Sequence, residues 1–233
     1  MKKVFVLTLN LMIVFAIHAQ DCTSFYFLTN NSTVEMTVYD RKGKESGKQS
    51  WKVTDVKNND KGYTSTIESV FIDDKGKESA KGTGTYICSN GVLQADMRMV
   101  VPQQQMEAYK DMEVRADEVF IEYPDNMSTG QTLKDGSFKM EMYNKNALAT
   151  TINFSQVNRK VEGKEKITTP AGSWDAYKIT YDGQFKAMIG GIGIPMNFKV
   201  AEWFAPGFGM VKSETYSKNG KLMGSTLLTG YKK

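Results

Sequence analysis

The sequence predicts an all-β sandwich or barrel of about a dozen strands, with one or two short helices. From Thr33 onward, short segments of alternating apolar and polar residues are separated by turns rich in glycine, asparagine and aspartate. Only one segment has a convincing helix pattern, and no linker or repeat of firm period divides the chain. These observations favour one large β domain over two small ones.

The first half of the chain alternates strands with polar turns. Turns are expected at residues 40–44, 58–62 and 73–77, and Asn90-Gly91 suits a type I′ hairpin turn because both residues tolerate positive φ. The expected strands cover Thr33–Tyr39, Ser50–Val56, Tyr63–Ile72, Glu78–Cys88 and Val92–Val101.

One amphipathic helix is expected over Pro102–Glu113. Proline suits the first helical position because its φ is already helical and no N–H is needed there. Met106, Tyr109 and Met112 recur every three residues and form an apolar face. The segment therefore predicts a short helix over or beside the sheet.

The second half of the chain continues the β pattern to its end. The turn at residues 169–172, Thr-Pro-Ala-Gly, separates the long strand that ends at Thr169 from the next strand, which begins at Trp174. The expected strands cover Glu118–Tyr123, Ser137–Tyr143, Leu148–Thr169, Trp174–Tyr181, Ile194–Phe204, Met210–Tyr216 and Leu222–Gly230.

Residues 1–19 have the pattern of a secretory signal peptide. Two lysines precede an apolar run of about 14 residues, short of the roughly 20 that a membrane-spanning helix needs. Cleavage after Ala19 would leave residues 20–233 as a single β-barrel-like domain without a transmembrane segment; an uncleaved anchor is the alternative. Asp21 stands before Cys22 where a lipoprotein signal needs a small residue, so we expect a soluble exported protein.

The mature chain would contain two cysteines, Cys22 and Cys88. An even pair in an oxidising compartment predicts one disulfide between them, with two buried free thiols as the alternative. Such a bridge would tie the N-terminal segment to a strand in the middle of the first half.

The composition excludes several classes of function. His18, the only histidine, lies in the leader, so the mature protein has no imidazole for a metal site or for a histidine-dependent nucleophile. Loss of Lys2 and Lys3 lowers the net charge from +4 to +2, and only four arginines are present. We therefore expect no metal, no cofactor and no nucleic-acid partner.

Carboxylates are the remaining route to catalysis, because paired acids hydrolyse glycosides without histidine. Glu35, Glu141 and Glu202 each stand between apolar neighbours, and alternation places them on the opposite, solvated face of their strands. The protein is therefore expected not to be an enzyme, with a carboxylate-based hydrolase left open.

Methionine is the most suggestive residue type, with 12 of the 14 lying beyond residue 19. Met97 with Met99, and Met140 with Met142, alternate so that each pair shares one strand face, where flexible side chains can line a cavity for apolar ligands. Ordinary core packing is the competing interpretation.

An uncharged turn at residues 187–196 contains Ile189, Ile192 and three glycines. It could form the lip of a cavity or touch a membrane or partner; folding back into the core is the alternative. The candidate ligand-binding residues are Met97, Met99, Met106, Tyr109, Met140, Met142, Ile189 and Ile192.

Three stretches, at residues 123–136, 167–177 and 202–212, resemble the exported TapB-like proteins of Gram-negative bacteria, a branch of a broader group of unknown function. The similarity covers nearly the whole mature chain. The resemblance implies a half-open β-barrel with a helix across its mouth, similar to periplasmic carriers of lipoprotein acyl chains. It also implies unusual backbone angles at Gly207 and Gly209, and a barrel filled by Trp203 and Phe208. It brings no catalytic residues.

Together, the residues and the resemblance predict an exported protein of the periplasm or cell surface that binds a lipid or another apolar ligand without catalysis. The alternative is a structural or interaction module of the envelope, with a filled core and a protein partner.

Overall fold

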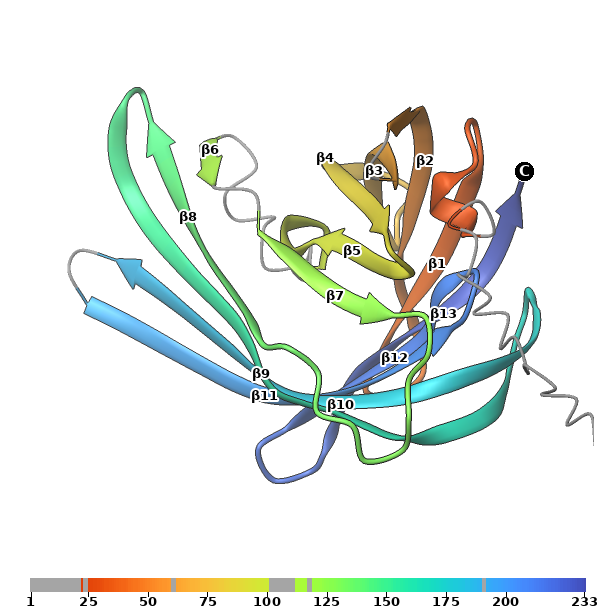
Figure 1. Ribbon diagram of the computed structural model, residues 1–233. Coiled ribbons are helices and arrows are strands. Elements are labelled where there is room, and N and C mark those ends of the chain that lie inside the picture. The colour runs from red at the N-terminus through yellow and green to blue at the C-terminus, as the bar shows by residue number, and fades with distance from the viewer. Residues whose placement is uncertain (1–21, 23–24, 60–61, 101–111, 117–118, 190–191) are drawn as a thin grey trace, which may run out of the picture.

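The computed structural model describes residue 22 and residues 25–59, 62–100, 112–116, 119–189 and 192–233. They form one antiparallel sheet of 13 strands, curved into a half-open barrel (Figure 1). The strand order is β6-β8-β9-β10-β11-β12-β13-β1-β2-β3-β4-β5-β7. The strands are β1 (Thr33–Asp40), β2 (Glu45–Asn59), β3 (Gly62–Asp73), β4 (Glu78–Ser89), β5 (Val92–Asp96), β6 (Glu113–Ala116), β7 (Phe120–Pro124), β8 (Gly136–Asn144), β9 (Ala147–Thr169), β10 (Gly172–Ile189), β11 (Ile192–Ala205), β12 (Gly209–Ser217) and β13 (Leu222–Lys232).

The two edges of the sheet belong to consecutive strands of the chain. β6 and β7 are the outermost strands, and residues 117–119 connect them. Four residues of extended chain span at most about 14 Å, so the edges approach each other at this point. The sheet therefore has to curve back on itself, which creates a concave interior.

Side-chain hydrogen bonds set the hairpins of the first half. Asp40 accepts backbone N–H bonds from Lys42 and Lys44 at 2.8 and 2.9 Å. Asp73 repeats this arrangement in the β3–β4 turn. These bonds stabilise the charged carboxylates and lower the pKa of both aspartates. The predicted Asn90-Gly91 turn has positive φ at both residues, 51° and 74°, as a type I′ turn requires.

The strand expected over residues 92–101 ends earlier, at Asp96. The backbone N–H of Arg98 donates to the Asp96 carboxylate at 2.9 Å, and the chain turns into the 3₁₀ helix η3 (Met97–Val100). An aspartate that bonds the backbone two residues on competes with the ladder bonds of a strand. Met97 and Met99 therefore do not share a strand face.

The helix expected over residues 102–113 falls almost wholly outside the described residues. Its last residue, Glu113, instead begins β6, a strand that the periodicity did not predict. The described residues contain only 3₁₀ turns as helical structure.

The N-terminal segment that contains Cys22 and the 3₁₀ helix η2 (Tyr26–Leu28), here called the N-terminal plug, lies against the interior of the curved sheet. The disulfide between Cys22 and Cys88 joins the N-terminal segment to β4. The helix η2 follows it, with all three side chains buried. The disulfide thus holds η2 against the sheet.

Candidate functional site

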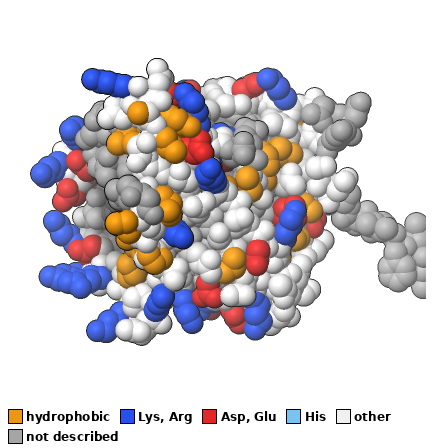
Figure 2. Space-filling view, turned by 90° about the vertical axis from the view of Figure 1, so that its left-hand side faces the viewer, with side chains coloured by type: hydrophobic (Ala, Val, Ile, Leu, Met, Phe, Trp, Pro, Cys, Tyr) orange, Lys and Arg blue, Asp and Glu red, His pale blue; other side chains and the backbone are white. Residues whose placement is uncertain are grey.

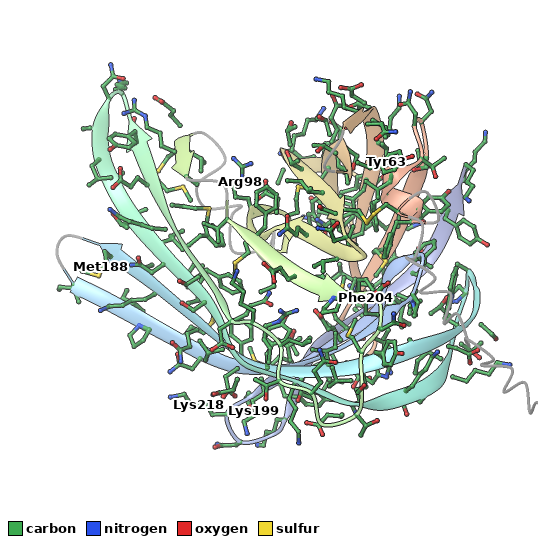
Figure 3. All side chains as sticks on the ribbon, viewed as in Figure 1. Tyr63, Arg98, Met188, Lys199, Phe204 and Lys218 are labelled. Carbon is green, nitrogen blue, oxygen red and sulfur yellow. A yellow bond between two sulfur atoms is a disulfide. The ribbon has the colours of Figure 1, made fainter. Side chains whose placement is uncertain are left out.

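A cavity of about 340 Å³ lies on the concave side of the sheet. Five alternate residues of β11 line it, because successive side chains of a strand point to opposite faces. They are Met196, Phe198, Val200, Glu202 and Phe204. Figure 3 shows Phe204 close to β7, whereas Lys199 lies on the outer side of the sheet.

Aromatic pairs form the walls of the cavity. The rings of Tyr123 and Phe204 stack with centroids 4.6 Å apart and 4° between their planes. Phe27 of η2 stacks on Tyr86 at 4.8 Å and 9°. Such pairs contribute about 0.5–1.5 kcal/mol beyond the area they bury. The N-terminal plug therefore supplies part of the cavity wall.

The cavity reaches solvent near the β12–β13 hairpin. Met223 lines it and is 46% exposed. Asp40, at the start of the β1–β2 hairpin, also lines it. The inner part is aromatic, and the outer part carries several serine and threonine side chains.

Glu202 is the buried carboxylate of this cavity. Its side chain lines the cavity, the residue is only 3% exposed, and its Oε1 has no hydrogen-bond partner. Burial raises the pKa of Glu202, while the Arg159 charge and a hydrogen bond with Tyr123 act in the opposite direction.

The expectation that Glu202 is solvated is therefore wrong. Alternation correctly separates Glu202 from its neighbours Ala201 and Trp203, but both faces of β11 are buried at this end of the strand. Glu35 and Glu141, by contrast, are partly exposed and pair with lysines, at 3.2 and 2.6 Å.

A β-bulge turns Arg159 into the interior. Two residues of β9, Asn158 and Arg159, stand opposite the single residue Tyr181 of β10. Asn158 takes a positive φ of 59°, as the bulge requires. The buried positions of β9 are even-numbered before the bulge and odd-numbered after it. Without this change of phase, Arg159 would point outward.

Arg159 is fully buried and holds the cluster behind the cavity wall together. Its Nη1 donates to the backbone carbonyls of Glu122 at 3.1 Å and Lys134 at 2.8 Å. The guanidinium carbon lies 5.0 Å from the centre of the Tyr123 ring, while Nε and Nη2 have no partner. Tyr123 therefore stands between the buried cation and the Glu202 carboxylate.

Three tyrosines complete the polar environment of Glu202: Tyr123 is buried, and Tyr86 and Tyr181 are partly buried. Burial raises the pKa of Tyr86, Tyr123 and Tyr181 well above the ordinary value of 10, and the negative charge of Glu202 raises them further. All three hydroxyls stay protonated near neutral pH. Glu202 and these three phenols therefore form a polar group within the aromatic inner wall.

Asp96 shows what a satisfied buried carboxylate looks like in the same fold. It is fully buried, and Arg98 binds it through the backbone N–H and through Nε at 2.9 Å, with Nη2 as a further donor. Glu202 has no comparable set of donors.

The structure separates the predicted ligand-binding residues. Met99 lines the cavity. Met97, Met140 and Met142 are buried in the hydrophobic core and are not among the residues that line this cavity. Ile192 is 71% exposed near the end of the β10–β11 hairpin, away from the cavity lining.

Other predicted site residues lie outside the described structure. Met106 and Tyr109 belong to residues 101–111, and the side chain of Ile189 is likewise undescribed.

Different methionines line the cavity beside Met99: Met196, Met210 and Met223. Met196 alternates with Phe198 and Val200, a period-two signal of the kind used for the other pairs. For Arg159, the only sequence signal was an arginine inside a long predicted strand.

The family-based expectations have mixed outcomes. Gly207 and Gly209 adopt the expected positive φ, 73° and 127°. Phe208 is buried in the second core cluster. Trp203 lies on the face of β11 opposite the cavity, under the ammonium groups of Lys178 and Lys212 at 5.2 and 4.2 Å. Trp203 is buried in the same cluster as Phe208 but does not line the cavity, because alternation places it on the face of β11 opposite Glu202.

The described residues contain no group of three or more His, Cys, Asp or Glu arranged to hold a metal ion. Within the same ranges, no helix has the length and apolar character needed to cross a membrane.

The comparisons with known proteins identify a family and a shared fold. A family model described as DUF3108-like matches residues 29–228. A candidate lipoprotein from Parabacteroides distasonis has a crystal structure with a TM-score of 0.76 at 24% identity, covering 89% of this chain and 98% of that one. A candidate exported protein with a YmcC-like fold, from Bacteroides fragilis, gives 0.72 at 22% identity, covering 88% and 97%. No curated protein matches the chain.

Proposed function

The chain belongs to the DUF3108-like family, and from this premise we propose that it is an exported protein that binds an apolar ligand, a lipid or acyl chain, without catalysis. The observation that carries the proposal is the aromatic cavity of about 340 Å³ on the concave side of the half-open barrel. Small-molecule sites are concave, largely apolar and about 300–1,000 Å³ in volume.

The chemistry of the wall supports this function. Aromatic residues and methionines make up half of the residues that line the cavity, and flexible methionines adapt to chains of different shape. The apolar face of β11 continues beyond the cavity to Ile194, which is 54% exposed. This strip would contact a chain that extends out of the cavity.

Export to the periplasm or cell surface, after removal of residues 1–19, is part of the proposal. The signal-peptide pattern and the two structural relatives, described as lipoprotein and exported-protein candidates, support it. We assign the chain to the TapB-like branch on its three resembling stretches.

A dye-displacement assay tests the binding function. A solvatochromic naphthalene dye should bind the purified protein and be displaced by dodecanol. Ser213→Trp, which fills the cavity from β12, should weaken dye binding at least tenfold. Thr83→Trp, on an exposed position of β4, should not change it. Far-UV circular dichroism verifies that both variants fold.

Organic-solvent extraction of protein from its native host provides a second measurement. The proposal expects a bound lipid in the extract. An empty extract, together with no dye binding, would refute it.

A second candidate function rests on exposed apolar side chains at the free ends of the long hairpins. Leu148 is 54% and Ile192 71% exposed. Figure 2 looks onto this side of the molecule and shows hydrophobic patches among charged side chains. Figure 3 places Met188 at the same end. A partner protein of the envelope would cover such a surface.

Crosslinking in cell envelopes distinguishes this second function. Ile192→Asp should remove a crosslinked partner that Asn197→Asp, at an exposed polar position of the same strand, retains. Equal crosslinking of both variants would exclude this surface.

A further inference from the structure

The cavity holds a buried carboxylate, Glu202, with an unpartnered oxygen, and this feature bears on the polar end of an apolar ligand. This inference rests on the proposed binding function and adds the chemistry of the ligand. It starts from Glu202, whose Oε1 lacks a partner although the residue is only 3% exposed and faces the cavity. A buried acceptor without a partner is unfavourable until a donor reaches it.

The protein groups around Glu202 do not supply this donor. Tyr123 bonds to the carboxylate, yet Oε1 remains without a partner. The two partnerless nitrogens of Arg159 belong to a side chain that does not line the cavity. The missing donor therefore has to enter through the cavity.

The charge balance decides which kind of donor fits. Arg159 is a buried cation that already interacts electrostatically with Glu202, so the pair is close to neutral overall. An ammonium group would add an uncompensated positive charge to an apolar site. A carboxylate would meet Glu202 with the same sign of charge and without a proton to donate.

We propose that the cavity binds neutral amphiphiles, in which an acyl or alkyl chain lies along the aromatic wall and a terminal hydroxyl or amide N–H donates to Glu202 Oε1. The ligand enters with its polar end first, so that its terminal polar group lies deepest in the cavity, next to Glu202. Free fatty acids in their anionic form are discriminated against.

Two further unpartnered groups in the cavity are consistent with a ligand that carries a polar end. Gln49 Nε2 and Trp51 Nε1 lie on the cavity-facing side of β2 and lack acceptors. They are available to a carbonyl or hydroxyl oxygen of the same ligand, or to water.

A matched ligand series tests the proposal at pH 8 by dye displacement. Dodecanol and dodecanamide should bind about tenfold more tightly than dodecane, whereas dodecanoate and dodecylammonium should bind no better than dodecane. Glu202→Leu should abolish the advantage of the alcohol. Glu202→Gln keeps an acceptor oxygen but removes the charge, so it should retain dodecanol and gain affinity for dodecanoate by about tenfold.

Glu35→Gln serves as the control, because Glu35 lies outside the cavity lining and is partly exposed. It should leave the whole series unchanged. Thermal unfolding verifies the fold of each variant. If Glu202→Leu does not fold, the gain in affinity of Glu202→Gln for dodecanoate decides between the outcomes.

Each outcome has a distinct meaning. Equal binding of dodecanol and dodecane overturns the role of Glu202 and means that water is its only partner. The proposed binding of apolar chains remains intact in that case. Tightest binding of dodecylammonium or dodecanoate overturns the preference for a neutral ligand. No binding by any member refutes the proposed function itself.

Discussion

Replacement of Arg159 by methionine tests whether the buried cation and Glu202 form one energetic unit. Methionine retains much of the apolar stem but removes the bonds from Nη1 to two backbone carbonyls, at 3.1 and 2.8 Å. Each bond from a charged donor contributes about 1.5–3 kcal/mol. Release of the two partnerless nitrogens offsets part of this loss.

Glu202 would also lose its neighbouring positive charge. Because Arg159 and Glu202 interact across Tyr123 and not as a direct ion pair, the two lost hydrogen bonds dominate, and we expect Arg159→Met to cost about 3–5 kcal/mol. Glu202→Gln alone should cost about 1–2 kcal/mol at neutral pH. Because the two side chains interact, the double variant should cost about 1–3 kcal/mol less than the sum of the single variants.

Urea unfolding followed by circular dichroism measures the cycle, with an unchanged slope as evidence for an unchanged fold. Arg115→Met is the matched control, because the Arg115–Glu113 ion pair lies on the surface and should change stability by less than about 0.5 kcal/mol. Additivity of the two core substitutions within about 0.5 kcal/mol would refute the coupling. A neutral effect of Arg159→Met would refute the structural role of the arginine.

Three further predictions concern stability. Burial raises the folded-state pKa of Glu202 above its ordinary 4.5, so the folded state binds more protons than the unfolded chain. The free energy of unfolding should therefore fall as pH rises above 4.5, by about 1.4 kcal/mol per unit of pKa difference. Glu202→Gln should lack this component in urea titrations across pH. Replacing Cys22 and Cys88 by alanine should cost about 4 kcal/mol for a separation of 66 residues, measured against the oxidised protein. Gly183→Ala should cost about 1–3 kcal/mol in thermal unfolding because the Phe198 ring occupies the space of a new Cβ; an unchanged melting temperature contradicts this packing.

Local sequence signals were sufficient where the physics is local. Alternation predicted the strand from Leu148 to Thr169, which matches β9 (Ala147–Thr169) closely. The Asn90-Gly91 turn follows from the backbone freedom of its two residues. Where a local hydrogen bond competes with the ladder, as at Asp96, the predicted strand was too long.

The site was less accessible to sequence reasoning. Met97 and Met99 appeared to share a strand face, but the turn after Asp96 separates them into different core clusters. Period two reports that two residues share a face only while the strand continues.

Taken alone, the sequence determined the β architecture, most turns and the cysteine pair, because alternation and turn chemistry act over a few residues. The tertiary structure decided which face is the inside. Glu202 is buried because the sheet curves until both faces of β11 are covered at one end. Arg159 is buried because one extra residue at the Asn158 bulge reverses the alternation of β9. Both depend on strand pairings distant along the chain, which no local pattern records.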